Sequence, residues 1–149
     1  MPTNDKERPG IDERLMMAIV RVSERFKRKS SAIFVDYGIS FSQYNVLRLL
    51  DGCIGSQSAI TEISRQLLVS TPNMSGIAKR LEKSGFVSRS RDKNDERKTI
   101  LTLKTPGRQV LAKIKNLQEK NIEKFLATCS KDNKKSLLEL LKDMLKRDI

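Results

Sequence analysis

Residues 60–103 decide the fold, and they read ITEISRQLLVSTPNMSGIAKRLEKSGFVSRSRDKNDERKTILTL. The first half of this stretch carries apolar residues at the three- and four-residue spacing that is typical of amphipathic helices. The second half carries two short runs of interleaved apolar and polar residues, separated by a polar segment rich in turn formers. The pattern predicts two short helices joined by a tight turn and followed by a two-stranded β-hairpin. This is the layout of a winged helix-turn-helix.

The first predicted helix covers residues 59–67. Ser58 is expected to cap it, because a serine oxygen can accept a hydrogen bond from a free N–H of the first turn. Its core face is expected to consist of Ile60, Ile63 and Leu67. Leu68 and Val69 then form the turn.

The second predicted helix begins near Thr71, where Ser70 or Thr71 can serve as the cap. Pro72 falls in its first turn, where the missing N–H costs little. Gly85 can take the left-handed conformation that often ends a helix. The buried face is expected to consist of Met74, Ile77, Ala78 and Leu81.

The opposite face of the second helix carries short polar side chains near its start and cations near its end. The residues are Ser70, Thr71, Asn73, Ser75, Gly76, Lys79, Arg80 and Lys83. A DNA recognition helix needs this arrangement, because its first residues reach base edges while flanking cations neutralise phosphates. An ordinary solvated helix face would look similar. Gly76 favours recognition, since a glycine inside a helix costs roughly 1 kcal/mol and close approach to another backbone would explain it.

The predicted hairpin pairs residues 86–91 with residues 99–103 across a polar tip at residues 92–97. Cations gather on the hairpin: Arg89, Arg91, Lys93, Arg97 and Lys98. Arginines at the tip of a projecting hairpin suit insertion into a narrow, electronegative minor groove. The alternative is an ordinary surface hairpin that its charge keeps soluble.

Residues 70–87, STPNMSGIAKRLEKSGFV, followed by Asp95 and Arg97 and then by Leu-Thr-Leu and Pro-Gly, resemble the MarR-type transcriptional regulators. The resemblance extends over nearly the whole chain. It implies a mainly α fold: a winged helix-turn-helix with flanking N- and C-terminal dimerisation helices and a two-stranded β-wing. In this family the arginine of an Asp-x-Arg signature, matched here by Arg97, reaches the minor groove. The aspartate, matched here by Asp95, helps to hold the wing.

The resemblance also implies a homodimer, a repressor and a cleft that holds a small aromatic effector. The chain departs from the family pattern at two positions. Leu68 stands in the turn where a glycine is common, and Lys104 stands where a threonine is usual, so that Thr105 would supply the cap of the next helix instead.

The 149 residues are expected to form one domain. Residues 1–10 are expected to be a mobile tail, because they are rich in proline and charge. Residues 40–104 would form the DNA-binding region. Residues 11–35 and 105–149 would supply the dimerisation helices.

Apolar spacing predicts the remaining helices. A long helix is expected from residue 11 to residue 34, followed by one that opens with a capping box of Ser40 and Gln43. The expected buried stripe of the first helix is Leu15, Ile19, Val22, Phe26 and Ile33. That of the helix after the hairpin is Leu111, Ile114, Leu117, Ile122, Phe125 and Leu126.

The last predicted helix is too apolar to lie alone on a surface. Its apolar residues are Leu137, Leu138, Leu140, Leu141, Met144 and Leu145. They span more than one narrow stripe, so the helix needs cover on two sides. A twofold partner would supply it and would fit a palindromic DNA site. The alternative is packing against the first helix of the same chain.

Composition narrows the classes of function. The net charge is +12, of which +5 falls in residues 60–104, and this balance favours a polyanionic partner. The chain has no histidine, and Cys53 and Cys129 lie outside any metal spacing, so the sequence predicts no catalytic site, metal or cofactor. Both cysteines are expected to be buried as small apolar groups. No segment reads as a membrane span or export signal, and we expect a cytoplasmic protein.

The sequence therefore predicts a transcriptional regulator that binds specific double-stranded DNA. Three alternatives stay open. A nonspecific architectural DNA-binding protein would use the same charge. Binding to double-stranded RNA is disfavoured, because the deep major groove of RNA excludes a recognition helix. A winged fold could also serve protein–protein interaction without nucleic acid.

Overall fold

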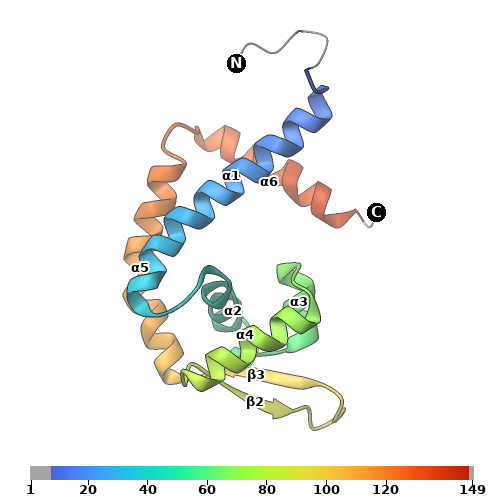
Figure 1. Ribbon diagram of the computed structural model, residues 1–149, viewed down its shortest axis with the longest axis vertical. Helices are drawn as coiled ribbons and strands as arrows, with labels where there is room; N and C mark the ends of the chain where they lie inside the picture. Colours follow the sequence, from blue (N-terminus) through green and yellow to red (C-terminus); the bar gives the residue numbers. More distant parts are fainter. Residues whose placement is uncertain (1–7, 148–149) are drawn as a thin grey trace.

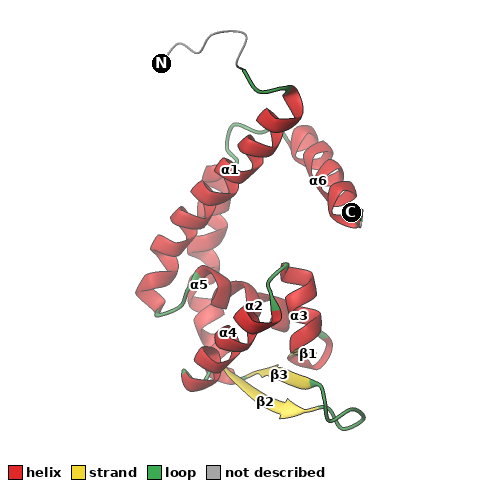
Figure 2. Cartoon of the chain, turned by 45° about the vertical axis from the view of Figure 1, so that its right-hand side comes forward, coloured by secondary structure: helices red, strands yellow, loops and turns green. Residues whose placement is uncertain are grey.

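The computed structural model describes residues 8–147, so most of the predicted mobile tail at residues 1–10 lies outside the described residues. The chain folds into a mainly helical structure in which a winged region lies at one end and long helices at the other (Figures 1 and 2). The helices are α1 (Ile11–Phe34), α2 (Phe41–Asp51), α3 (Ile60–Leu67), α4 (Thr71–Lys83), α5 (Thr105–Phe125) and α6 (Lys131–Lys146). The strands are β1 (Gln57–Ala59), β2 (Val87–Arg91) and β3 (Thr99–Leu103). The predicted fold class is confirmed.

Local signals place the start of the winged region. Helix α1 ends at Phe34, and a short 3-10 turn leads to Gly38, whose φ of 72° lies in the left-handed region. The predicted capping box opens α2. The Ser40 backbone N–H donates to Gln43 Oε1 at 2.9 Å, and the Gln43 N–H donates to Ser40 Oγ at 3.1 Å.

The predicted two-stranded wing is present as the hairpin of β2 and β3. The sheet has a third strand, β1, which was not predicted, and its strand order is β1-β3-β2. Strand β1 pairs antiparallel with β3 and places Ser58 opposite Leu101. Ser58 therefore does not cap α3, whose N-cap is Ala59 without a side-chain hydrogen bond. A three-residue strand is too short to show an alternating pattern, so the sequence reads it as the approach to a helix.

Helices α3 and α4 form the predicted helix-turn-helix. Leu68 makes the turn in the left-handed conformation, with φ of 53°, in the position where the family favours glycine. Ser70 is the cap of α4 and accepts a hydrogen bond from the Asn73 N–H at 3.4 Å. After α4, Gly85 takes φ of 78° and the Phe86 N–H donates to the Leu81 carbonyl at 3.0 Å.

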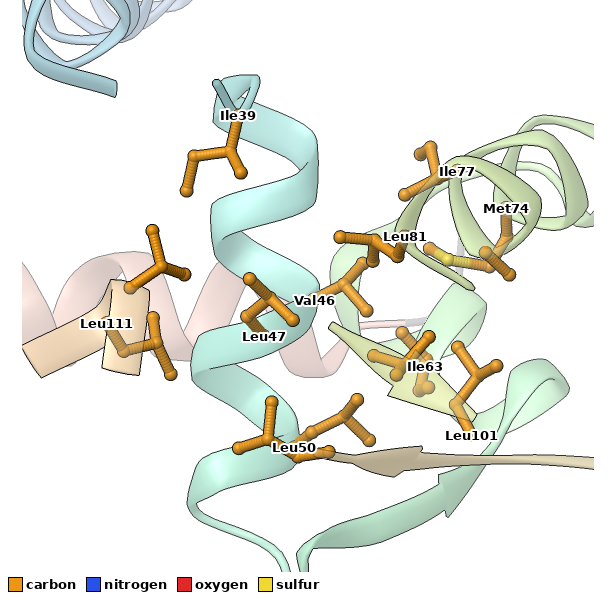
Figure 3. Packing of buried hydrophobic residues seen from close by; sticks show 14 of the residues in the cluster. Ile39, Val46, Leu47, Leu50, Ile63, Met74, Ile77, Leu81, Leu101 and Leu111 are labelled. Atoms are coloured by element: carbon orange, nitrogen blue, oxygen red, sulfur yellow. The ribbon is translucent and has the colours of Figure 1, made fainter. Parts of the chain in front are cut away.

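The core forms around α2, which lies between α5 on one side and α3, α4 and the sheet on the other (Figure 3). Val46, Leu47 and Leu50 of α2 are fully buried. They belong to one cluster with the buried faces of the winged helices, the sheet and α5, including Ile63, Met74, Ile77, Leu81, Leu101, Leu111 and Ile114. This packing holds the polar face of α4 outward.

Helix α5 starts against the wing through Gly107. A Cβ atom there would lie 2.5 Å from the Phe86 carbonyl oxygen and 2.6 Å from Leu103 Cδ1, so only glycine fits. The predicted Thr105 cap was wrong. Thr105 is already helical, and the N-cap residue is Lys104, which makes no side-chain cap. The Lys104 N–H donates instead to the Phe86 carbonyl at 2.9 Å. The close packing of Gly107 against Phe86 brings the two backbone groups together.

The crossing of α1 and α5 contains a buried polar contact that the sequence did not predict. Ser30 and Gln118 are buried, and Ser30 Oγ accepts hydrogen bonds from Gln118 Nε2 at 3.1 Å and from Asn121 Nδ2 at 3.3 Å. The predicted stripes were partly wrong, since Leu15, Val22 and Leu117 are about half exposed. Cys53 and Cys129 are half-buried rather than buried.

Helix α6 has no buried residue. The alternative in which α1 of the same chain covers it is therefore wrong. Its leucines at positions 137, 138, 140 and 145 are 50–70% exposed. In residues 8–147, no helix combines the length and apolar character that a membrane span requires.

Candidate nucleic-acid interface

Helix α4 presents its polar residues outward because its other face is anchored in the core by Met74, Ile77, Ala78 and Leu81. Seven predicted site residues lie on or next to this outer face. Ser70, Thr71, Asn73, Lys79, Arg80 and Lys83 are exposed, and Ser75 is half-buried. The structure thus brings these residues together on one helix, with amide and hydroxyl groups at its start and cations toward its end.

Gly76 lies in the middle of this face. A Cβ atom added there would meet only the Arg80 guanidinium, with Nη1 at 3.6 Å, which is an ordinary contact. The packing of the chain therefore does not require a glycine at this position, in contrast to Gly107.

The tip of the wing is folded by two aspartates. Asp92 Oδ1 accepts a hydrogen bond from the Asn94 N–H at 2.9 Å, and Asp95 Oδ1 accepts one from the Arg97 N–H at 3.1 Å. The Lys98 N–H donates to the Asp95 carbonyl at 3.0 Å. These are side-chain turns of the kind that aspartate favours. Asp95 therefore shapes the loop that carries Arg97.

The Arg97 side chain is 93% exposed, and its Nε lies 3.5 Å from Asp95 Oδ1. Lys93 and Lys98 are exposed on the same loop. Figures 1 and 2 show the loop between β2 and β3 projecting past the end of α3 and away from the body of the molecule. The cations of the tip are thus free to reach a ligand that contacts α4.

The two arginines of β2 differ in their surroundings. Arg91 is exposed. Arg89 Nη2 lies 3.0 Å from Oε1 of Glu82 in the last turn of α4, so this arginine is partnered rather than free, in contrast to what the sequence suggested. The hydrogen bond from the Arg89 side chain, helped by its charge, lowers the pKa of Glu82, and the same contact raises the pKa of Arg89.

Glu82 was not predicted to belong to this surface. The two partners of this ion pair lie on different elements. Predicting the pair requires knowing both which side of α4 Glu82 faces and how the strands of the hairpin are paired. The register places Arg89 opposite Leu101, on the face of the hairpin that also carries buried Val87. No group of three or more His, Cys, Asp or Glu side chains in residues 8–147 could hold a metal ion.

The fold and this surface define a winged helix-turn-helix protein. A family model described as "MarR family" matches residues 39–99. The transcriptional regulator PapX of Escherichia coli is 30% identical over 103 residues, which cover 69% of this chain and 63% of PapX. The match thus takes in less than two thirds of that relative. The winged region of the chain is thus similar to the MarR family.

Solved structures show the same fold over nearly the whole chain. The structure of Sco3205, a MarR-family regulator from Streptomyces coelicolor bound to DNA, aligns with a TM-score of 0.82 at 20% identity and covers 95% of this chain and 91% of Sco3205. The structure of NadR bound to 4-hydroxyphenylacetate aligns with a TM-score of 0.73 at 24% identity and covers 99% of this chain and all of NadR. The long flanking helices therefore belong to the shared fold.

Proposed function

We propose that this chain is a DNA-binding transcriptional repressor that acts as a homodimer on a palindromic operator. The observation that carries the proposal is the outer face of α4, whose polar start and cationic end lie beside a wing with an exposed arginine tip. In this arrangement α4 enters the major groove, where base edges can be distinguished. The wing tip enters the flanking minor groove.

The residues divide by chemistry. Asn73, Ser75 and Thr71 carry short side chains that can hydrogen-bond to bases, and an asparagine amide pairs well with adenine. The cations on α4 and the cations of the wing other than Arg89, which Glu82 holds, would neutralise phosphates, and Arg97 would enter the minor groove. Gly76 would let the helix approach the DNA closely, since the chain itself leaves room for a side chain there.

The apolar surface that the single chain leaves uncovered supports the homodimer. Exposed apolar residues of α1 and α6 lie at the end away from the wing (Figure 2). They are Ile11, Leu15, Met16, Met17, Val20, Val22, Leu137, Leu138, Leu140, Met144 and Leu145. A patch of this kind marks an interface, and a second copy would cover it while presenting a second α4 to the DNA.

A small aromatic acid is the effector that the proposal expects. A hollow of about 270 Å³ lies between α2 of the winged region and α5. Its lining includes the apolar side chains of Tyr44, Leu111 and Ile122, the cations Arg48, Arg108 and Lys115, and the acids Asp51 and Glu119. The apolar side chains suit an aromatic ring, and the three cations outnumber the two acids, which favours a negative group on that ring. A second hollow of about 820 Å³ lies between α1 and α5.

Paired substitutions separate the two hollows. Ala112 lines the hollow between α2 and α5, and Ala18 lines the one between α1 and α5. Ala112→Trp should abolish the thermal shift that an aromatic acid such as 4-hydroxyphenylacetate causes, while Ala18→Trp should leave it unchanged. If Ala18→Trp abolished the shift and Ala112→Trp did not, the effector would bind in the second hollow instead.

The experiment that tests the function is selection of duplexes from a random DNA library by the purified protein, followed by affinity measurements at several salt concentrations. The proposal expects an enriched palindrome and a specific-to-nonspecific ratio of about 10³ or more. A ratio near one would indicate an architectural DNA-binding protein. No binding to any duplex would favour a protein-interaction module.

A further inference from the structure

An ion pair joins the recognition helix to the wing. Arg89 Nη2 lies 3.0 Å from Glu82 Oε1, and the two side chains are 33% and 40% exposed. Glu82 lies in the last turn of α4, and Arg89 is the third residue of β2. The contact therefore spans the turn at which the wing leaves the helix (Figure 1).

The strand alternation explains why Arg89 points toward α4. Val87, Arg89 and Arg91 are opposite Leu103, Leu101 and Thr99 of β3. Side chains two residues apart lie on the same face of a strand, and buried Val87 and Leu101 show that this face is turned toward the body. Val87, Arg89 and Arg91 thus follow one another from the core outward along one face of β2. Arg89 is the one that lies beside Glu82.

Arg91 differs from Arg89 although it lies on the same face. It is about 6.6 Å further along the strand and is exposed. Within residues 8–147 the Arg91 side chain makes no hydrogen bond or ion pair, whereas the Arg89 side chain is bound to Glu82. A cation that is already held by a carboxylate is a poorer ligand for a phosphate than a free one. Arg91 is therefore a matched comparison for Arg89.

Glu82 needs an explanation on this surface. It is the one acid in α4, and the same helix carries Lys79, Arg80 and Lys83. A free carboxylate beside a DNA backbone would repel the phosphates. Bound to Arg89, it is neutralised and connects two elements that must contact the DNA together.

We propose that Glu82 and Arg89 are positioning residues, and that their ion pair fixes the angle of the wing relative to α4 so that both reach their grooves at once. The inference rests on the proposed function. Two contacts on one ligand strengthen each other only when their geometry permits both at the same time. Base-specific binding by α4 and minor-groove binding by the wing are therefore coupled through this pair.

The test uses Glu82→Gln, Arg89→Gln, the charge swap E82R/R89E and the control Arg91→Gln. Each protein is titrated with the duplex that the unmodified protein selects and with a mixed-sequence duplex, over a range of salt. If the unmodified protein selects no duplex, the proposed function fails and the inference fails with it. If selection succeeds, the variants test the inference alone.

The expected results separate positioning from simple charge. Glu82→Gln adds positive charge and Arg89→Gln removes it, so a pure charge effect would shift affinity for both duplexes in opposite directions and leave their ratio unchanged. Positioning lowers the specificity ratio about two- to fivefold in both variants, as expected for loss of a surface ion pair. The charge swap restores the ratio, and Arg91→Gln weakens both duplexes equally and lowers the salt slope by about one.

A measurement without DNA shows that the pair exists in solution. In a carboxyl NMR titration, Arg89→Gln should move the pKa of Glu82 up toward its ordinary value, while Arg91→Gln should leave it in place. The proposal is overturned if the Glu82 pKa does not respond to Arg89→Gln, or if it responds while the specificity ratio stays constant. A drop of the salt slope by one in Arg89→Gln would make Arg89 a phosphate ligand and would also overturn it.

Discussion

Gly107 and Gly76 are both helical glycines, but their surroundings differ. At Gly107 a Cβ atom would collide with the Phe86 carbonyl oxygen at 2.5 Å, a backbone atom that cannot move alone. At Gly76 it would meet only the end of the flexible Arg80 side chain at 3.6 Å. One glycine is thus required by packing between α5 and the wing, and the other is not required by the chain at all.

Alanine at these two positions should act in opposite directions. Gly107→Ala should destabilise the fold by about 1–3 kcal/mol, because α5 must shift away from the wing. Gly76→Ala should stabilise it by about 0.5–1 kcal/mol through helix propensity, and should weaken DNA binding. Urea unfolding and DNA titration of both variants measure this. Tighter DNA binding by Gly76→Ala would refute close approach of the helix to DNA.

Arg97 should contribute affinity without reading bases. Its side chain is almost fully exposed, and the minor groove barely distinguishes A·T from T·A. Arg97→Ala should weaken binding to operator and scrambled DNA alike and lower the salt slope by about one if the contact is to phosphates. Salt titrations on both duplexes provide the measurement. A loss confined to the operator would show that Arg97 reads sequence.

At the scale of elements, helix α3 carries a local charge cluster. Glu62 accepts hydrogen bonds from Arg65 Nε at 3.1 Å and from Gln66 Nε2 at 2.8 Å. The hydrogen bond from Arg65 and then that from Gln66 lower the Glu62 pKa from 4.5 to about 2. Because the folded pKa is depressed, the cluster stabilises the fold above pH 4.5 and loses this contribution as the pH falls toward 2.

Glu62→Gln should therefore lower the thermal midpoint slightly at neutral pH, with the difference from the unmodified protein vanishing as the pH approaches 2. The effect is small because the groups are exposed. Thermal unfolding from pH 2 to 7 measures it, with Glu96→Gln on the wing as the control. A difference that does not change with pH would contradict the proposed cause.

The predictable elements were those whose signals are local. Ser40 with Gln43, and Ser70 with Asn73, interact three residues apart. The sequence alone therefore predicts the start of α2, and it narrows the cap of α4 to Ser70 or Thr71. Strand β1 was missed because Ser58 is part of a strand only through its pairing with Leu101, which is 43 residues away in the chain. Glu82, the partner of Arg89, was missed because the two residues lie on different elements, α4 and β2. Contacts between elements need the packed structure.

In the molecule as a whole, a single chain cannot bury the apolar residues of α6. Its apolar stripe was predicted, but the described residues do not cover it. The chain thus leaves exposed the surface that a twofold partner would bury, at the end of the molecule opposite the wing (Figure 2). A dimer would present two α4 helices about one helical turn, ~34 Å, apart.

Leu138→Glu should shift sedimentation at micromolar concentration from dimer to monomer, since a buried, unpaired carboxylate is costly in an interface. Lys134→Glu on the same helix is the control for the change in charge and should stay dimeric. Circular dichroism confirms that both variants are folded. An unmodified protein that sediments as a monomer while binding DNA with full affinity would rule out the dimer.

Base reading by the outer face of α4 can be measured at a single residue, Asn73. Its side chain is exposed in the first turn of α4, while its backbone N–H is held by Ser70. Affinities of Asn73→Ala for the selected operator and for duplexes changed at each position should be measured over a range of salt. If α4 reads bases, Asn73→Ala loses preference at one position per half-site, worth roughly 1–3 kcal/mol, and keeps the salt slope unchanged. Base preference that stays intact at every position would contradict it.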